Sequence, residues 1–376
     1  MLSILTNILI FVFVIGFLTF IHELGHFLAA KLVKAKVYEF SLGFGPKLIS
    51  KKYKGTVYSI RIILLGGFVR ILGDGDSGEY GKGKNIKNSS ENLKNKSKLS
   101  QIFVMLAGVI MNVLFAIVSY YIILGLSNWK TAPIYVDLKG VNIIGAEVGN
   151  IVGYEVIPGE NSERAGLPSF GVIYEVDNKK INSRDELVEI IKEKEEVDIF
   201  VCNDNGSECG RYDVKVNDGK IGVYVLEGSI LNYENIKASS GVMYLVNNLK
   251  IIFKVLGSMI GNARETGDYS DLSNTVSGPI GVFLLIDSLK NRGIAVFLSL
   301  VADLSISLVI MNILPIPALD GGRVFILMVE SILRKDLNEK IEAIIINVSM
   351  IFLIILIVLI MIKDVVNIDN MRNMFG

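Results

Sequence analysis

The sequence predicts an α-helical polytopic membrane protein with four transmembrane helices, a membrane-associated β-hairpin and an inserted α+β PDZ-like domain. Three observations predict the membrane class. Of 376 residues, 51% are hydrophobic and 20% are charged, whereas soluble domains carry about 45–50% and about 25%. Four stretches are apolar over the roughly 20 residues that a helix needs to cross a bilayer. Two long polar regions lie between these stretches, near 34–100 and 128–240.

The four apolar stretches set the order of the helices along the chain. They are Leu2–Val33, Ile102–Leu126, Val296–Leu314 and Ile341–Ile362. The first stretch has no positive residue at its start, no small-x-small cleavage site after it, and more length than a signal sequence needs. We therefore expect it to stay in the protein as a transmembrane helix.

The distribution of charge predicts the orientation. Residues 31–100 contain fifteen Lys and Arg against five Asp and Glu, while residues 128–240 contain twelve against twenty. Positive loops beside membrane spans stay in the cytoplasm, so the first region should be cytoplasmic and the second extracytoplasmic. Both termini are then extracytoplasmic. The net charge of zero gives no indication of a nucleic-acid partner.

Both histidines of the chain lie in one motif, His-Glu-Leu-Gly-His at residues 22–26. On a helix, a spacing of four puts His22 and His26 on one face, which suits two ligands of a tetrahedral zinc ion. Glu23 could then act as general base towards water at the metal. The alternative is a coincidental buried His pair, but ionisable groups in a spanning segment are costly and usually functional.

A catalytic zinc usually has three protein ligands and an open position. Because the chain has no third histidine, the remaining ligand must be Asp, Glu or Cys, and Asp320 is the best candidate. It follows Pro315 and Pro317, which break the helix and free backbone polar groups at membrane depth. Asn312 could offer hydrogen bonds to a substrate or intermediate. Asp320 could also be an ordinary turn residue before two glycines.

These two motifs together resemble the site-2 protease family of intramembrane zinc metalloproteases, and most closely its bacterial regulators of sigma-E-type proteases with one PDZ domain. The first motif is His-Glu-Leu-Gly-His, and the second is Asn-x-x-Pro-x-Pro-x-Leu-Asp-Gly at 312–321. Further similar segments are Ser41–Pro46, Leu64–Val69, Ala107-Gly108 with Asn112, and Ser277–Gly281. The family's usual Pro-Leu-Gly-Gly reads Leu-Leu-Gly-Gly here.

The resemblance implies His22, His26 and Asp320 as Zn²⁺ ligands and Glu23 as the catalytic base. It also implies a reentrant β-hairpin that holds the unwound substrate as an added strand, which an exposed strand edge can do. Its glycines could instead be ordinary turn residues; they are Gly43, Gly45, Gly66 and Gly67. On polarity and position alone, Asn112 or Asn312 could steady the oxyanion.

By the same resemblance, the protein lies in a bacterial plasma membrane and cuts transmembrane segments of single-span proteins. Substrates would be anti-sigma factors already trimmed outside, or remnant signal peptides. Two rivals are a catalytically silent relative that only binds such segments, and a metal transporter. The intact motifs argue against the first, and the scarcity of other ionisable residues in spans one and two argues against the second.

The second polar region predicts a small α+β domain. Residues 145–225 alternate short β-like runs with turns and one helical stretch, Ser183–Lys194. Ala165-Gly166-Leu167 and the residues after it resemble a PDZ domain, although Phe170-Gly171 replaces the family's Gly-Asp and leaves peptide binding open. The only cysteines, Cys202 and Cys209, flank a predicted hairpin turn, where either a disulfide or two free thiols would fit.

Residues 241–262 could be a surface helix or a fifth span, because they are apolar but carry Lys250 and Lys254 one turn apart. Parity favours the surface, since an extra crossing would put Asp320 on the opposite side from both histidines. The lysine-rich stretch Gly81–Lys98 is then a cytoplasmic loop that is either a solvated linker or a contact to anionic lipid.

The sequence thus predicts nine segments. The first five are helix one with the His motif (1–33), the cytoplasmic hairpin region (34–100), helix two (101–127), the PDZ-like domain (128–240), and the surface helix with its connector (241–295). The last four are helix three with the Asp motif (296–322), a cytoplasmic loop (323–340), helix four (341–363), and the C-terminal tail (364–376).

Overall fold

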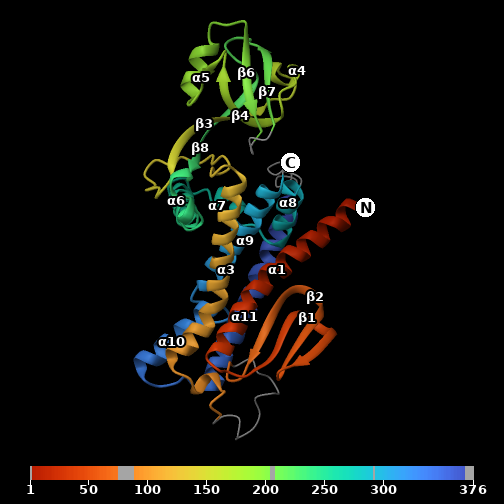
Figure 1. The fold of residues 1–376 in the computed structure, drawn as a ribbon, viewed down its shortest axis with the longest axis vertical. Helices are drawn as coiled ribbons and strands as arrows, with labels where there is room; N and C mark the ends of the chain where they lie inside the picture. Colours follow the sequence, from red (N-terminus) through yellow and green to blue (C-terminus); the bar gives the residue numbers. More distant parts are fainter. Residues whose placement is uncertain (1, 75–88, 204–207, 291–292, 369–376) are drawn as a thin grey trace. The chain divides into compact units, whose positions relative to one another are not determined.

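The computed structural model describes residues 2–74, 89–203, 208–290 and 293–368. The chain forms two compact units (Figure 1). The first unit combines residues 1–116 with 274–376, and the second contains residues 117–273. Residues 81–88 of the lysine-rich loop predicted at 81–98 lie outside the described residues, as does part of the loop between the two cysteines.

The long helices follow the predicted apolar stretches. In chain order the helices of the membrane part are α1 (Leu2–Leu32), α3 (Lys98–Leu126), α8 (Pro279–Leu289), α9 (Ile294–Ile313), α10 (Asp320–Leu333) and α11 (Glu339–Val366). Among the described residues, five helices are long and apolar enough to cross a membrane, so the protein is polytopic. The fifth is the helical segment Glu234–Thr266, which satisfies the same criteria of length and composition.

Helix α1 packs against other helices of the first unit at two places described here. Towards its N-terminal half, Val14 and Leu18 pack with Ile286 of α8 and with Leu300 of α9 in one apolar cluster. Towards its C-terminal half, Gly25 lies against the backbone carbonyl of Ala107 in α3, so closely that a Cβ atom would not fit. Small residues allow membrane helices to approach in this way. The histidine motif therefore includes a residue, Gly25, at which α1 lies directly against α3.

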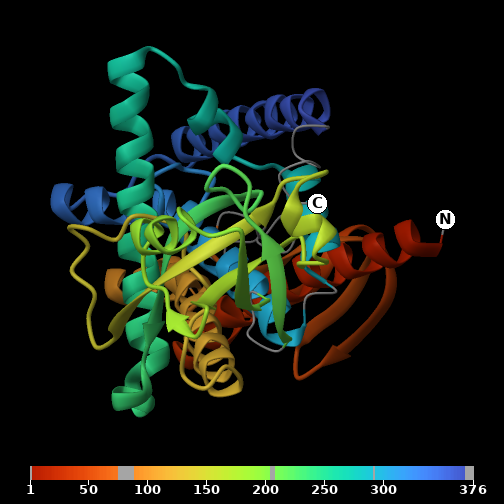
Figure 2. The ribbon, with the colours of Figure 1, turned by 90° about the horizontal axis from the view of Figure 1, so that it is seen from above.

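The strands β1 (Val37–Tyr53) and β2 (Thr56–Ile71) form an antiparallel sheet beside α1 (Figures 1 and 2). The register gives residues 39–42 of β1 partners on both sides, in 57–60 and in 67–70 of β2. β2 thus folds around the start of β1, and the described register pairs the end of β2, residues 67–71, on one side only. The bend requires glycine at Gly66, where φ is +124° and a Cβ would strike the ring of Phe44.

A buried carboxylate ties the sheet together. Glu39, only 2% exposed, forms ion pairs with Arg61 at 2.8 Å and Lys47 at 3.2 Å and accepts a hydrogen bond from Ser59 at 2.8 Å. Burial alone would raise the pKa of this carboxyl group, but the hydrogen bonds from Arg61, Ser59 and Lys47 outweigh it and hold the pKa below its usual value.

The second unit contains a six-stranded sheet. Its strands are β3 (Glu147–Val156), β4 (Phe170–Val176), β5 (Lys179–Lys180), β6 (Glu196–Cys202), β7 (Cys209–Lys215) and β8 (Val223–Asn232). Five of them lie in the order β7-β6-β4-β3-β8, and β5 pairs with β4. The helices that follow or interrupt the strands are α4 (Asn161–Arg164), α5 (Arg184–Ile191), α6 (Ser240–Thr266) and α7 (Ser270–Thr275).

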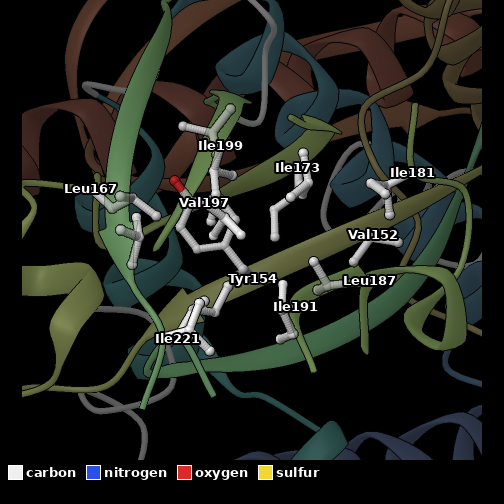
Figure 3. Close-up of a cluster of buried hydrophobic side chains, with 14 residues drawn as sticks. Val152, Tyr154, Leu167, Ile173, Ile181, Leu187, Ile191, Val197, Ile199 and Ile221 are labelled. Atoms are coloured by element: carbon white, nitrogen blue, oxygen red, sulfur yellow. The ribbon is translucent and has the colours of Figure 1, made fainter. Parts of the chain in front are cut away.

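The core of this sheet is apolar. Fourteen buried side chains pack together, among them Tyr154, Leu187, Val197 and Ile199 (Figure 3). Alternate residues of β6 point into this core, as expected for a strand with one buried face. The two cysteines form a disulfide across the β6–β7 hairpin.

Candidate metal centre

The two histidines meet on one face of α1. Nε2 of His22 lies 3.2 Å from Nε2 of His26, and the two residues are 9% and 8% exposed. The helix itself produces this approach, because residues four apart are neighbours on its surface. The local spacing thus places two imidazole nitrogens side by side, as the sequence predicts.

Asp320 reaches this pair from the other end of the chain. Oδ2 of Asp320 lies 3.0 Å from Nε2 of His22 and 3.4 Å from Nε2 of His26. The helix α9 ends at Ile313, and Asp320 is the first residue of α10. The following glycines allow this, because Gly322 lies against the carbonyl of Ile316 with no room for a side chain. The broken helix predicted from the prolines therefore aims a carboxylate at the histidines.

The three atoms fit the ligand set of a zinc ion. Their mutual distances are 3.0, 3.2 and 3.4 Å. Zinc–ligand bonds of about 2.0–2.1 Å in tetrahedral directions separate two ligand atoms by roughly 3.3 Å. Two imidazoles and one carboxylate also match the donor set of catalytic zinc sites, which keep a fourth position open. His22, His26 and Asp320 can thus hold such an ion without rearrangement.

A cavity of about 370 Å³ opens beside these ligands. Glu23 lines it, next to the glycine-rich end of β2, and a Cβ added to Gly67 would lie 3.3 Å from Cγ of Glu23. A carboxylate, three ligand atoms and a strand edge therefore share one space. The lining residues come from five parts of the chain: Thr19, His22, Glu23, His26, Phe44, Gly66, Gly67, Phe68, Val69, Ile71, Asp74, Met105, Leu308, Asn312, Ala318, Leu319, Asp320 and Arg323.

Helix α3 supports the histidines from behind. Val104 offers its carbonyl oxygen to Nδ1 of His26 at 2.8 Å. Gly108 faces both rings: an added Cβ would lie 2.7 Å from Nε2 of His22 and closer still to Nε2 of His26. Neither support was assigned a role from the sequence. Their signal is weak, because a backbone carbonyl has no residue signature and Gly108 is one glycine among 36.

Only some of the residues predicted to bind substrate line the cavity. Asn312, Gly66 and Gly67 line the cavity. The lining residues among those described do not include Gly43 or Gly45, although Phe44 between them does contribute. Asn112 also lies outside the lining; its side-chain nitrogen is 3.4 Å from Nδ1 of His22. Substrate binding by these residues stays a prediction.

An ion pair at the wall of the same cavity is not predicted by the sequence. Arg323 in α10 is one turn after Asp320, and its guanidinium lies 2.5 Å from Oδ1 of Asp74. Arg323 also donates to the backbone carbonyl of Asp74. This pair joins the helix that carries Asp320 to the segment after β2. The only sequence signal is the spacing of three residues from Asp320.

Apolar helices of membrane-spanning length around two buried histidines, an aspartate and a neighbouring glutamate define a membrane metalloprotease. Comparison with known proteins supplies the family. The sequence pattern of Peptidase family M50 matches residues 10–356, and the chain belongs to this family, the site-2 proteases. It is a multi-pass membrane zinc metalloprotease.

Several curated proteins are similar over nearly their full length. FN1322 of Fusobacterium nucleatum is 31% identical over 335 residues, which cover 86% of this chain and 88% of that one. The Regulator of sigma-W protease RasP of Bacillus subtilis is 26% identical over 412 residues, covering 92% and 95%. The Zinc metalloprotease RasP of Bacillus licheniformis is 26% identical over 410 residues, covering 93% and 96%.

Proposed function

We propose that His22, His26 and Asp320 bind the zinc ion and that Glu23 is the general base for hydrolysis of peptide bonds within transmembrane segments of single-span proteins. The observation that carries this proposal is the triangle of ligand atoms, 3.0 to 3.4 Å on each side, with Glu23 in the same cavity. When bound, zinc lowers the pKa of water towards about 7 and polarises a carbonyl group.

The protein's own residues supply the rest of the chemistry. Glu23 takes a proton from the attacking water and returns it to the leaving amine, a role worth about 10²–10⁴ in rate. It lies one residue after His22, so the helix that fixes a ligand also fixes the base. Asn312 lines the cavity near these groups and offers hydrogen bonds to the substrate or the oxyanion.

The end of β2 supports binding of an unwound substrate. A transmembrane helix hides its peptide groups in its own hydrogen bonds, so a segment must unwind before hydrolysis. Gly66 to Val69 line the cavity, and the described register leaves one edge of residues 67–71 without a strand partner. An extended peptide can add to such an edge. Gly43 and Gly45 would act indirectly, by bending β1 around Phe44.

The membrane arrangement and substrates complete the proposal. Four crossings, with α6 on the membrane surface, put Asp320 at the same depth as the histidines and both termini outside. The sheet of the second unit is then an extracytoplasmic PDZ-like domain, and cleavage occurs near the cytoplasmic face. Because one relative is named a regulator of sigma-W protease, trimmed anti-sigma factors are the first substrates to test, with remnant signal peptides second.

The test uses the purified full chain with a single-span reporter that lacks its outer domain. The wild type should cut within the span, and Glu23→Gln should reduce the rate at least 10²-fold while zinc content is unchanged. Glu189→Gln on the exposed face of α5 is the matched control and should cut like the wild type. Equal cutting by the wild type and Glu23→Gln would exclude Glu23 as base. If the wild type binds zinc but cuts neither a trimmed anti-sigma reporter nor a remnant signal-peptide reporter, the protein would be a catalytically silent binding protein.

A further inference from the structure

We propose that Asn112 is a positioning residue for His22: its side-chain oxygen accepts the Nδ1–H of His22 and so keeps Nε2 free to bind metal. This inference rests on the proposed ligand role of His22. It places Asn112 behind the metal centre. The sequence alone suggested a different role, namely contact with the substrate or the oxyanion.

The position of Asn112 separates it from the substrate. It is fully buried in α3, and its side-chain amide is 3.4 Å from Nδ1 of His22. Nε2, on the far side of the same ring, is the atom 3.0 Å from Asp320. Asn112 and the ligand triangle thus lie on opposite edges of one imidazole. A group in this position acts on the ring and cannot reach a peptide in the cavity.

The chemistry of imidazole then selects which amide atom faces the ring. Neutral histidine has one N–H and one lone pair, and the metal needs the lone pair. If Nε2 of His22 is the ligand, Nδ1 must carry the hydrogen and needs an acceptor beside it. An amide nitrogen at that place would demand a lone pair from Nδ1 and put the hydrogen on Nε2, between the ligand atoms.

The oxygen and nitrogen of an amide are interchangeable by a half turn of the side chain. With the nitrogen towards His22, Oδ1 of Asn112 is buried and has no hydrogen-bond partner among the described residues. A buried acceptor without a partner costs about 1–3 kcal/mol. The half turn places this oxygen against Nδ1–H of His22, which is the arrangement that a metal ligand requires.

His26 provides an internal comparison. Its Nδ1 faces the carbonyl oxygen of Val104 at 2.8 Å, an atom that can only accept. That contact fixes the Nδ1–H form of His26 and leaves its Nε2 for the metal. Asn112 does for His22 what the backbone does for His26, from the same helix. Ser305 of α9, also fully buried, donates to the backbone carbonyl oxygen of Asn112 at 3.1 Å and holds this part of α3 in place.

The test measures zinc affinity on the full chain in detergent by competition with a chromophoric chelator. Asn112→Leu keeps the shape and removes the acceptor, so its affinity should fall about 10–100-fold. Asn112→Asp keeps an oxygen that accepts, so its affinity should stay within about threefold of the wild type. Asn312→Leu, the matched asparagine of the cavity, should bind zinc like the wild type.

Three outcomes would overturn the inference. One is wild-type zinc affinity in Asn112→Leu together with slow cleavage, which would assign Asn112 to substrate or oxyanion. Another is equal loss in the Leu and Asp variants. The third is a melting temperature of the zinc-free protein that falls in both Asn112→Leu and Asn112→Asp. His22→Ala is the separate check on the proposed function: unchanged zinc affinity there would remove His22 as a ligand.

Discussion

Both units of this protein have an apolar core, but the first also buries a cluster of histidine and asparagine side chains. In the first unit, His22, His26 and Asn112 are buried among apolar helices and lie next to one another. In the second, the core of the sheet consists of aliphatic side chains around Tyr154 (Figure 3). Buried polar groups are costly unless they have partners, whereas buried aliphatic groups are the main source of stability.

Zinc chemistry and resistance to unfolding therefore depend on different parts of the molecule. A change near the histidines removes ligand geometry while the surrounding apolar helices stay in place. A change in the sheet core removes buried apolar area and leaves the ligand triangle untouched. Substitutions beside the histidines and in the sheet core should therefore separate zinc binding from resistance to unfolding.

Gly108→Ala should have the largest effect. The added methyl would lie 2.7 Å from Nε2 of His22 and closer to His26, so the rings must move apart. We expect zinc affinity and kcat/KM to fall at least 100-fold, measured by chelator competition and reporter cleavage. Gly125→Ala in the same helix meets no atom within 4 Å and is the control. Normal zinc binding by Gly108→Ala would contradict the described packing of α3 against α1.

Ile199→Ala tests the opposite unit. Ile199 is fully buried in the sheet core, and truncating such a side chain costs about 2–5 kcal/mol. Ile199→Val should cost about 0.5–1.5 kcal/mol. Limited proteolysis of the full chain in denaturant should detect earlier cutting within residues 145–225, in that order of severity. Zinc affinity should be unchanged below the unfolding transition. A loss of zinc would show that metal binding depends on the core of the sheet.

Asp74→Asn tests the ion pair that joins α10 to the end of the hairpin. Arg323 would lose its charged partner at 2.5 Å, and α10 would hold Asp320 less firmly. Groups that orient a ligand carrier typically contribute about tenfold or more in metal affinity, so we expect roughly a tenfold fall. Asp336→Asn, an exposed carboxylate in the loop after α10, is the control. An unchanged zinc affinity would show that α10 keeps Asp320 in position without this ion pair.

Glu39→Gln should have the smallest effect and depends on pH. Because hydrogen bonds hold the folded pKa of Glu39 below its usual value, its stabilisation is present above the unfolded pKa and is lost as pH falls through the folded pKa. At pH 7 we expect the variant to be about 1–2 kcal/mol less stable. The difference in melting temperature between wild type and variant should shrink towards pH 3. A constant difference would mean that packing, not charge, is responsible.

The sequence predicts those parts of the site that depend on local geometry or on strong local signals. The spacing of His22 and His26 fixes their approach on any helix, and Pro315 and Pro317 mark the break that exposes Asp320. The long apolar stretches predict the spanning helices for the same reason. Each of these inferences uses residues close together in the chain.

Apart from the approach of Asp320 to the histidines, contacts between distant segments could not be predicted in this way. The approach of α3 to both histidines depends on Gly25 and Gly108, which carry no side chain to signal a partner. The double pairing of residues 39–42 depends on how β2 bends, and the pair of Asp74 with Arg323 spans 249 positions. Polarity marked Asn112 as functional, but only the fold shows that it faces His22 from behind.

The most direct test of the metal site compares the zinc stoichiometry of Asp320→Ala with that of the wild type and Glu23→Gln, by elemental analysis after dialysis against a weak chelator. Our prediction is one zinc per chain for the wild type and Glu23→Gln and far less than one for Asp320→Ala. Full zinc occupancy in Asp320→Ala would contradict it, because Asp320 would then not complete the metal site.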